Sequence, residues 1–150
     1  MYVYKNILLP TDFSEGSEKA FLHAVDIAKS MNAKIHVLHI IQQMVYPAGF
    51  EIAQNSFSNI EEALEKNANS HLSETSKRLS NLGIDNETHI LMGKPSEQII
   101  EFSNQEFVDL VVIPTNGAGG LEHFLFGSTT EKVIRGVSCP VLVTHIDSNQ

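Results

Sequence analysis

The feature that most constrains the fold is a regular alternation of two kinds of segment along the chain. Short apolar runs rich in β-branched residues are typical of buried strands, and they are separated by longer segments whose apolar residues recur at helical spacing. This alternation predicts a mostly parallel sheet, because right-handed crossovers place the intervening helices on both of its faces. We therefore expect a single α/β domain over residues 1–150, built on a five-stranded, doubly wound, Rossmann-like sheet.

The expected elements follow from these runs and from local start and stop signals. Strands are predicted at Lys5–Pro10, Ala33–Ile41, Glu87–Met92, Val108–Ile113 and Val141–His145. Helices are predicted after Ser14, from Ile60 to Leu82, from near Pro95 and from Ser128. Ser14 has an N-cap side chain, Gly83 is a helix stop signal, and Pro95 suits the first turn of a helix. The segment 42–59 shows no clear period and is predicted to be a surface loop with room for a short helical turn.

Composition excludes several classes of function. The chain has 18 acidic and 10 basic residues and a net charge of -8, which opposes a general attraction to nucleic acid or to anionic lipid. Its apolar runs are far shorter than the roughly 20 residues that a membrane-spanning helix needs. The first residues do not show the pattern of a signal peptide, so we expect a cytoplasmic protein with neither a membrane nor a nucleic-acid partner.

The single cysteine and the seven histidines predict no metal centre and no catalytic residue. Cys139 cannot form an intrachain disulfide, and its apolar surroundings favour a structural thiol. His36 and His39 are three residues apart on a predicted strand, so they are expected to point to opposite faces. The sequence also contains no hydrolase elbow, P-loop or zinc-protease motif, which argues against an efficient enzyme.

Polar residues follow the first predicted strand at the edge where a doubly wound sheet binds its ligands. Pro10, Thr11 and Asp12 come directly after that strand. The carboxylate of Asp12 could accept hydrogen bonds from a ribose hydroxyl or an adenine amino group. It could equally satisfy the N–H groups at the start of the following helix. Both interpretations stay open from the sequence alone.

The loop after the fourth predicted strand carries a second candidate, a site for an anion. Gly127 and Ser128 open a helix whose N–H groups and positive dipole end favour a phosphate, and Thr129 and Thr130 add hydroxyl donors. Ser128 and Glu131 also fit a capping box, which would explain these residues without a ligand. The earlier glycine, Gly117, would let the backbone of the loop approach an anion closely.

This run resembles the nucleotide-binding signature of the universal stress protein family, G-x-x-G, nine residues, then G followed by Ser or Thr. Gly117, residues 118–126 and Gly127-Ser128 fit in register, whereas the first glycine falls on Pro114. The resemblance extends to the opening K-N-I-L-L-P-T-D-F-S-E, the strand ending H-V-L-H-I and the closing T-E-K-V-I-R-G-V-S-C-P-V-L-V. It covers essentially the whole chain.

The resemblance implies an adenine nucleotide alpha hydrolase-like fold that binds ATP or AMP, with or without Mg²⁺. It places Pro10, Thr11 and Asp12 beside the nucleoside and the backbone of Ile40 against the adenine edge. Gly117 would approach the ribose and phosphates, and the phosphate contacts would come from Gly127, Ser128, Thr129 and Thr130. Pro114 has no N–H to donate, which is expected to weaken the site without abolishing it.

The last predicted strand has an apolar edge that would aggregate if left bare. Pairing with its own copy solves this, so we expect a homodimer through Val141, Leu142, Val143, Thr144 and His145, as the resemblance also implies. Two functions remain open. One is a nucleotide-binding regulatory protein of the stress response with at most slow ATP hydrolysis. The other is a dimeric scaffold without useful nucleotide affinity, which meets an unknown protein partner through the segment 42–59.

Overall fold

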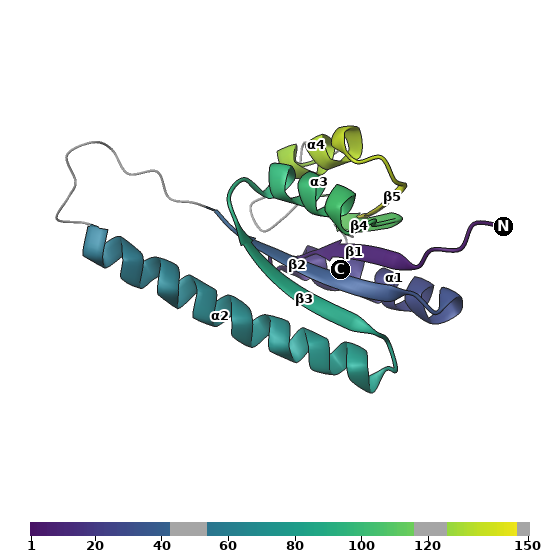
Figure 1. Cartoon of the computed structure of the whole chain (residues 1–150), viewed down its shortest axis with the longest axis horizontal. Helices are drawn as coiled ribbons and strands as arrows, with labels where there is room; N and C mark the ends of the chain where they lie inside the picture. Colours follow the sequence, from purple (N-terminus) through teal and green to yellow (C-terminus); the bar gives the residue numbers. More distant parts are fainter. Residues whose placement is uncertain (43–53, 116–125, 147–150) are drawn as a thin grey trace.

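The computed structural model describes residues 1–42, 54–115 and 126–146, and it confirms the alternation of strands and helices (Figure 1). The elements are β1 (Asn6–Pro10), α1 (Glu15–Met31), β2 (Lys34–Ile41), α2 (Gln54–Asn81), β3 (Asn86–Met92), α3 (Pro95–Gln105), β4 (Leu110–Pro114), α4 (Ser128–Gly136) and β5 (Val141–Thr144).

The five strands form one sheet in the order β3-β2-β1-β4-β5, and every neighbouring pair is parallel. The chain winds outward from β1 through β2 to β3, then returns to place β4 on the other side of β1. This is the doubly wound α/β fold that the sequence predicts. The winding reverses between β1 and β4, which is the position where open α/β sheets bind ligands beyond their strand ends.

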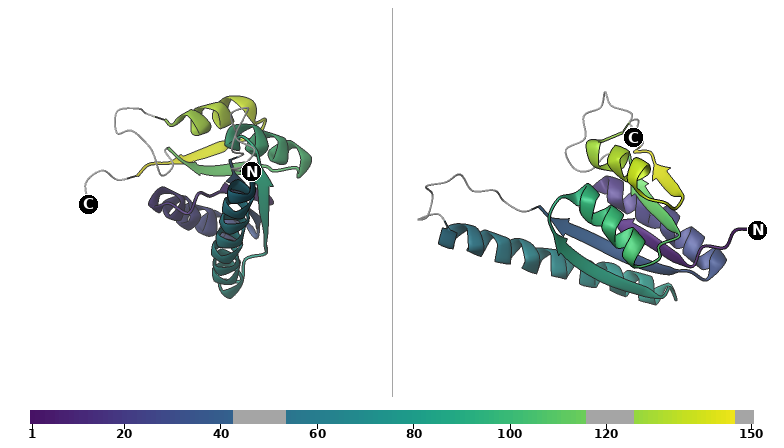
Figure 2. Two further views of the ribbon diagram at one scale, coloured as in Figure 1. Left: turned by 90° about the vertical axis from the view of Figure 1, so that its left-hand side faces the viewer. Right: turned by 45° about the horizontal axis from the view of Figure 1, so that its top comes forward.

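The two faces of the sheet are each covered by a pair of helices. α1 and α2 lie on one face and α3 and α4 on the other, as Figure 2 shows from two directions. Successive residues of β1 alternate between the two cores, with Ile7 and Leu9 packed on the α1 side and Leu8 on the α3 side. All three are at most 1% exposed, so β1 is the buried centre of the domain.

The helix boundaries follow the predicted signals in three places. Ser14 caps α1, and its hydroxyl oxygen accepts from the backbone N–H of Ser17 at 3.3 Å. Gly83 has a φ of +75°, the left-handed conformation that stops α2 and that glycine adopts without strain. Pro95 opens α3, where its missing N–H costs no helical hydrogen bond.

The long helix α2 differs from the prediction. It begins at Gln54, whereas the sequence predicts a loop to residue 59 and a helix start near Ile60. Ile60 and Leu64 are 41% and 43% exposed, and the first part of α2 extends past the sheet (Figure 1). The apolar period that predicts this helix starts at Ile60, so the residues before it carry no helical signal in the sequence. Within the described ranges, no helix is both long and apolar enough to cross a membrane.

Candidate functional site

The reversal between β1 and β4 brings the two predicted loops to the same edge of the sheet. Pro10–Asp12 leaves β1, and Pro114–Thr115 ends β4 next to it. The next described element along the chain is α4, which begins at Ser128. Gly117, the predicted ribose and phosphate contact, lies outside the described residues.

The loop after β1 is locked onto β2 by hydrogen bonds from both sides of Thr11. The N–H of Thr11 donates to the carbonyl of Leu38 at 2.9 Å. The carbonyl oxygen of Thr11 lies 2.8 Å from Nδ1 of His39. The hydroxyl oxygen of Thr11 accepts from the N–H of Phe13 at 3.0 Å. The loop therefore leaves β1 in one defined conformation rather than as a flexible turn.

Asp12 takes part in the start of α1. Its Oδ1 accepts from the backbone N–H of Ser14 at 3.0 Å and from the hydroxyl of Ser17 at 2.8 Å. These two bonds support the turn that leads into α1, whose N-cap is Ser14 rather than Asp12. The residue itself is exposed, and its contact with a nucleoside stays a prediction.

Phe13 occupies a strained backbone conformation beside these residues. Its φ is +64°, which a non-glycine residue adopts at a cost of about 1–3 kcal/mol. The ring lies between two histidine rings, with centroids 4.5 Å from His39 and 4.6 Å from His71. These stacking contacts hold Phe13 in place and connect the loop to β2 and α2.

The backbone of Ile40, the predicted adenine contact, lies on β2 just past the point where β1 ends. β1 pairs with β2 only as far as Pro10, which is in register with Leu38. Because the carbonyl of Leu38 points toward the β1 side, the N–H and C=O of Ile40, two residues further on, point to the same side. At this level β1 has ended, so these groups face the region beyond Pro10. The adenine contact itself stays a prediction.

Two hydrogen bonds fix the start of α4 to the end of β4, and a third joins the ends of β4 and β5. The carbonyl of Pro114 accepts from the buried hydroxyl of Thr130 at 2.8 Å. The carbonyl of Thr115 accepts from the N–H of Gly127 at 2.7 Å, and the N–H of Thr115 donates to Thr144 at 2.9 Å. Thr115, 5% exposed, is a positioning residue that the sequence reasoning missed, although a threonine between a buried strand and a glycine-rich loop is a usable signal.

The capping box predicted as an alternative at this helix does not form. Gly127 is the N-cap, which places Ser128 inside the first turn, and no side-chain cap bond is made within the described residues. Glu131 instead pairs with Arg135 at 3.0 Å. The N–H groups of Ser128, Thr129 and Thr130 are therefore in the first turn, where an α-helix supplies them with no intrahelical acceptor.

The predicted phosphate donors divide into two groups. The N–H of Gly127 and the hydroxyl of Thr130 are used inside the protein, so they position the helix start in this structure. Ser128 is exposed and Thr129 is half-buried. The start of α4 therefore offers backbone N–H and hydroxyl donors at the positive end of a helix dipole, which is an arrangement that can bind an anion.

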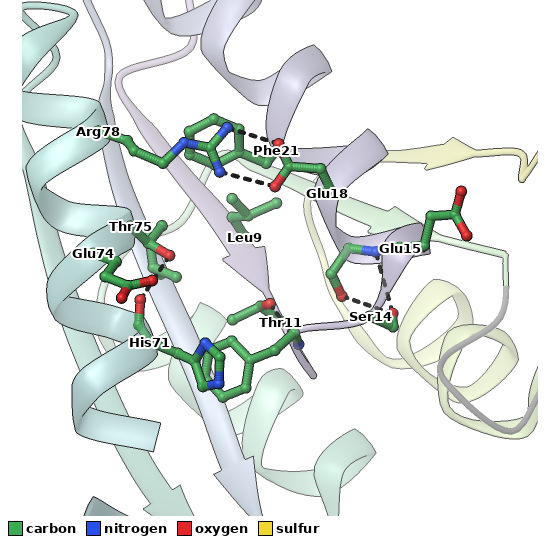
Figure 3. A pocket seen from close by; sticks show the side chains of 13 residues that line it. Leu9, Thr11, Ser14, Glu15, Glu18, Phe21, His71, Glu74, Thr75 and Arg78 are labelled. Atoms are coloured by element: carbon green, nitrogen blue, oxygen red, sulfur yellow. Dashed lines mark hydrogen bonds and ion pairs between the residues drawn. The ribbon is translucent and has the colours of Figure 1, made fainter. Parts of the chain in front are cut away.

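A pocket of about 330 Å³ lies between α1 and α2, next to the same β1 loop (Figure 3). Thr11, Phe13 and Ser14 contribute to its lining. On its far side, Arg78 of α2 makes two hydrogen bonds to Glu18 of α1, at 2.9 and 2.7 Å. The hydrogen bonds from Arg78 hold the pKa of Glu18 below its ordinary value. Nothing in the sequence pattern predicted this pocket.

The fold and the edge of the sheet together define a doubly wound α/β protein with donor groups gathered at its switch point. The model of the universal stress protein family matches residues 3–145. A universal stress protein of Methanocaldococcus jannaschii, MJ0531, is 36% identical over 94% of this chain and 82% of its own. The solved structure of MJ0577, from the same organism, superposes with a TM-score of 0.87 at 28% identity and covers 99% of this chain and 100% of that one. The chain belongs to the universal stress protein family.

Two more distant structures of the same fold were solved with nucleotides. One universal stress protein is in complex with cAMP, with a TM-score of 0.70 at 23% identity over 96% of this chain and 98% of that one. Another, from Archaeoglobus fulgidus, is in complex with dAMP, with a TM-score of 0.65 at 20% identity over 95% and 98%.

Proposed function

We propose that the chain binds an adenine nucleotide, ATP or AMP, at the switch point and acts in the cytoplasm as a regulatory protein of the stress response. The observation that carries this proposal is the start of α4, whose first turn is held against the end of β4 and has no side-chain cap from the described part of the chain. The nucleotide complexes of the two distant family members support the same class of ligand.

In this proposal the nucleoside lies beside Pro10, Thr11 and Asp12, with the adenine edge on the backbone of Ile40. The phosphates lie on the N–H groups of Ser128, Thr129 and Thr130, and Gly117 approaches the ribose and phosphates. Mg²⁺, where it accompanies ATP, is held through phosphate oxygens, as is usual for this ion.

The proline at the end of β4 limits the affinity. Pro114 has no N–H, and a hydrogen bond to a charged group contributes about 1.5–3 kcal/mol. If the signature glycine of related proteins donates from this position, binding here is weaker by roughly ten- to a hundredfold. We expect hydrolysis of ATP to be slow at most, since no general base is evident beside the proposed phosphates among the residues that the structure describes.

Calorimetric titration of nucleotide-stripped protein with ATP and AMP, each with and without Mg²⁺, tests the proposal. We expect saturable binding of one nucleotide per chain. Absence of binding at millimolar nucleotide would exclude the proposal and leave the second candidate, a dimeric scaffold of the same fold, which the missing donor at Pro114 favours.

Two variants at one position test the phosphate role of the helix start. Ser128→Asp places a negative charge where we expect the phosphates. Ser128→Asn is the control, because asparagine has nearly the same shape as aspartate and carries no charge. Repulsion of about 1–3 kcal/mol corresponds to a ten- to a hundredfold loss of affinity, and we expect it to be larger for ATP than for AMP. An aspartate near a helix N-terminus stabilises the fold, so unfolding would not explain the loss. Equal affinities of the two variants for ATP would contradict the proposed phosphate position.

We also propose a homodimer through β5. This strand is an edge of the sheet, and Val141, Leu142 and Val143 are half-buried. The carbonyls of Pro140 and Thr144 face β4, so the backbone groups of Val143 face outward. Val143→Pro therefore removes an outward N–H, whereas Val143→Thr keeps it. Sedimentation should show a dimer for the parent and for Val143→Thr and a monomer for Val143→Pro, and a monomeric parent protein would exclude this interface.

A further inference from the structure

Two histidines and a glutamate lie together on β2 and β3, away from the switch point. His36 is in register with Glu87, and His89 follows Glu87 by two residues, so all three side chains are on one face of the sheet. This is the face that α3 covers, because Leu38 shares it with His36 and packs in the same core as α3. We call these three residues the β2–β3 cluster.

The distances within the β2–β3 cluster suit one cation. Nδ1 of His36 lies 3.2 Å from Nε2 of His89, and Oε1 of Glu87 lies 3.9 Å from the same Nε2. One ligand atom from each residue lies within 4.8 Å of the other two. Two histidine nitrogens bound at about 2.0–2.1 Å to a tetrahedral Zn²⁺ are about 3.3–3.4 Å apart. The observed separation of the two nitrogens is close to that value.

The surrounding side chains hold the three ligands in these positions. The ring of Phe102 packs edge-on against both histidines, with centroids 5.8 Å from His36 and 4.7 Å from His89. Lys34 binds Oε2 of Glu87 at 2.9 Å, which leaves Oε1 directed toward His89. Contacts that orient metal ligands in this way raise metal affinity in known sites.

The cluster has a buried side and an open side. His36 is 4% exposed, whereas the side chains of His89 and Glu87 are 19% and 51% exposed. An ion can therefore reach the cluster from solvent, and water can complete its coordination. A metal ion binds the neutral form of the imidazole ring.

We propose that His36, Glu87 and His89 form a binding site for one Zn²⁺ ion or a similar divalent transition metal. Two imidazole nitrogens and one carboxylate oxygen are a donor set of such ions, whereas Mg²⁺ and Ca²⁺ prefer oxygen ligands alone. The bound ion would link β2 to β3, the other edge strand of the sheet. The alternative is a hydrogen bond between two neutral histidines with no ion.

The test uses the whole chain without an affinity tag, stripped of metal and titrated with Zn²⁺ by calorimetry, with Mg²⁺ in parallel. We expect one Zn²⁺ per chain and no comparable binding of Mg²⁺. His89→Gln and Glu87→Gln should each weaken Zn²⁺ binding by at least about ten- to a hundredfold, since even outer-shell changes reach this range. His23→Gln removes an exposed histidine of α1 and should bind Zn²⁺ as the parent protein does.

Binding of Co²⁺, followed by its visible absorption, gives a second readout of the ligand geometry. The absence of stoichiometric Zn²⁺ binding by the parent protein would overturn the proposal, as would equal affinities of the parent protein and Glu87→Gln. Glu87 is exposed, so its variant decides the question even if His89→Gln does not fold.

Discussion

Replacement of Thr130 by valine tests how α4 is held over the end of β4. Thr130 is 4% exposed, and its hydroxyl donates to the carbonyl of Pro114 at 2.8 Å. Valine has almost the same shape but cannot donate, so the substitution removes this hydrogen bond with little change in packing. The carbonyl of Pro114, in a buried residue, would then lack this donor.

The size of the effect follows from this burial. A hydrogen bond contributes about 0.5–1.5 kcal/mol, and a buried polar group left without a partner costs about 1–3 kcal/mol. We therefore expect Thr130→Val to lower the free energy of unfolding by about 1–3 kcal/mol. In a domain of this size, each kcal/mol lowers Tm by roughly 2–4 °C.

Urea unfolding followed by circular dichroism measures this loss, which should move the midpoint without changing the slope. Thr129→Val is the matched control, because it removes a hydroxyl from the adjacent, half-buried position. We expect Thr129→Val to stay within about 0.5 kcal/mol of the parent protein. Equal stability of Thr130→Val and the parent protein, or an equal loss in both variants, would refute this role of Thr130.

Three further predictions concern other parts of the fold. Burial raises the pKa of the Cys139 thiol, so iodoacetamide at pH 8 should modify it more slowly in the folded protein than in urea. The pKa of Glu18 lies below its usual 4.5 because of hydrogen bonds from Arg78, so the ion pair stabilises the fold above pH 4.5 and this contribution is lost as the pH falls. Both side chains of this ion pair are about half exposed, so its contribution to the free energy of unfolding should be below about 1 kcal/mol. Unfolding of Glu18→Gln and of the parent protein between pH 7 and 3 should show this difference at neutral pH and none at pH 3. A Cβ at Gly136 would meet the side chain of Ile100, so Gly136→Ala should cost about 1–3 kcal/mol in thermal unfolding, and an unchanged Tm would contradict this packing.

The parts of the fold that the sequence predicted depend on local patterns. The strands are short apolar runs, and Ser14 and Pro95 mark helix starts with their own side chains. The position of the candidate site could be predicted for the same reason. Alternating strands and helices imply a switch point, and the polar residues after β1 and β4 lie there.

The parts that could not be predicted depend on contacts between distant segments. The hydrogen bond from the N–H of Gly127 to the carbonyl of Thr115 joins the start of α4 to the end of β4, and no local pattern predicts it. The β2–β3 cluster joins two strands, and its members meet only through the register between them. A comparison of His36 with His39 within one strand correctly separates those two residues and cannot detect His89.

The central claim is that a nucleotide binds at the switch point, and amide chemical shifts of the isotope-labelled protein test it most directly. On titration with AMP and ATP, we expect the largest changes at Thr11, Asp12 and Ile40 with both nucleotides. The amides of Ser128 and Thr129 should respond more strongly to ATP than to AMP. Changes confined to the residues of α1 and α2 that line the pocket between these helices, or no changes at millimolar nucleotide, would contradict the account.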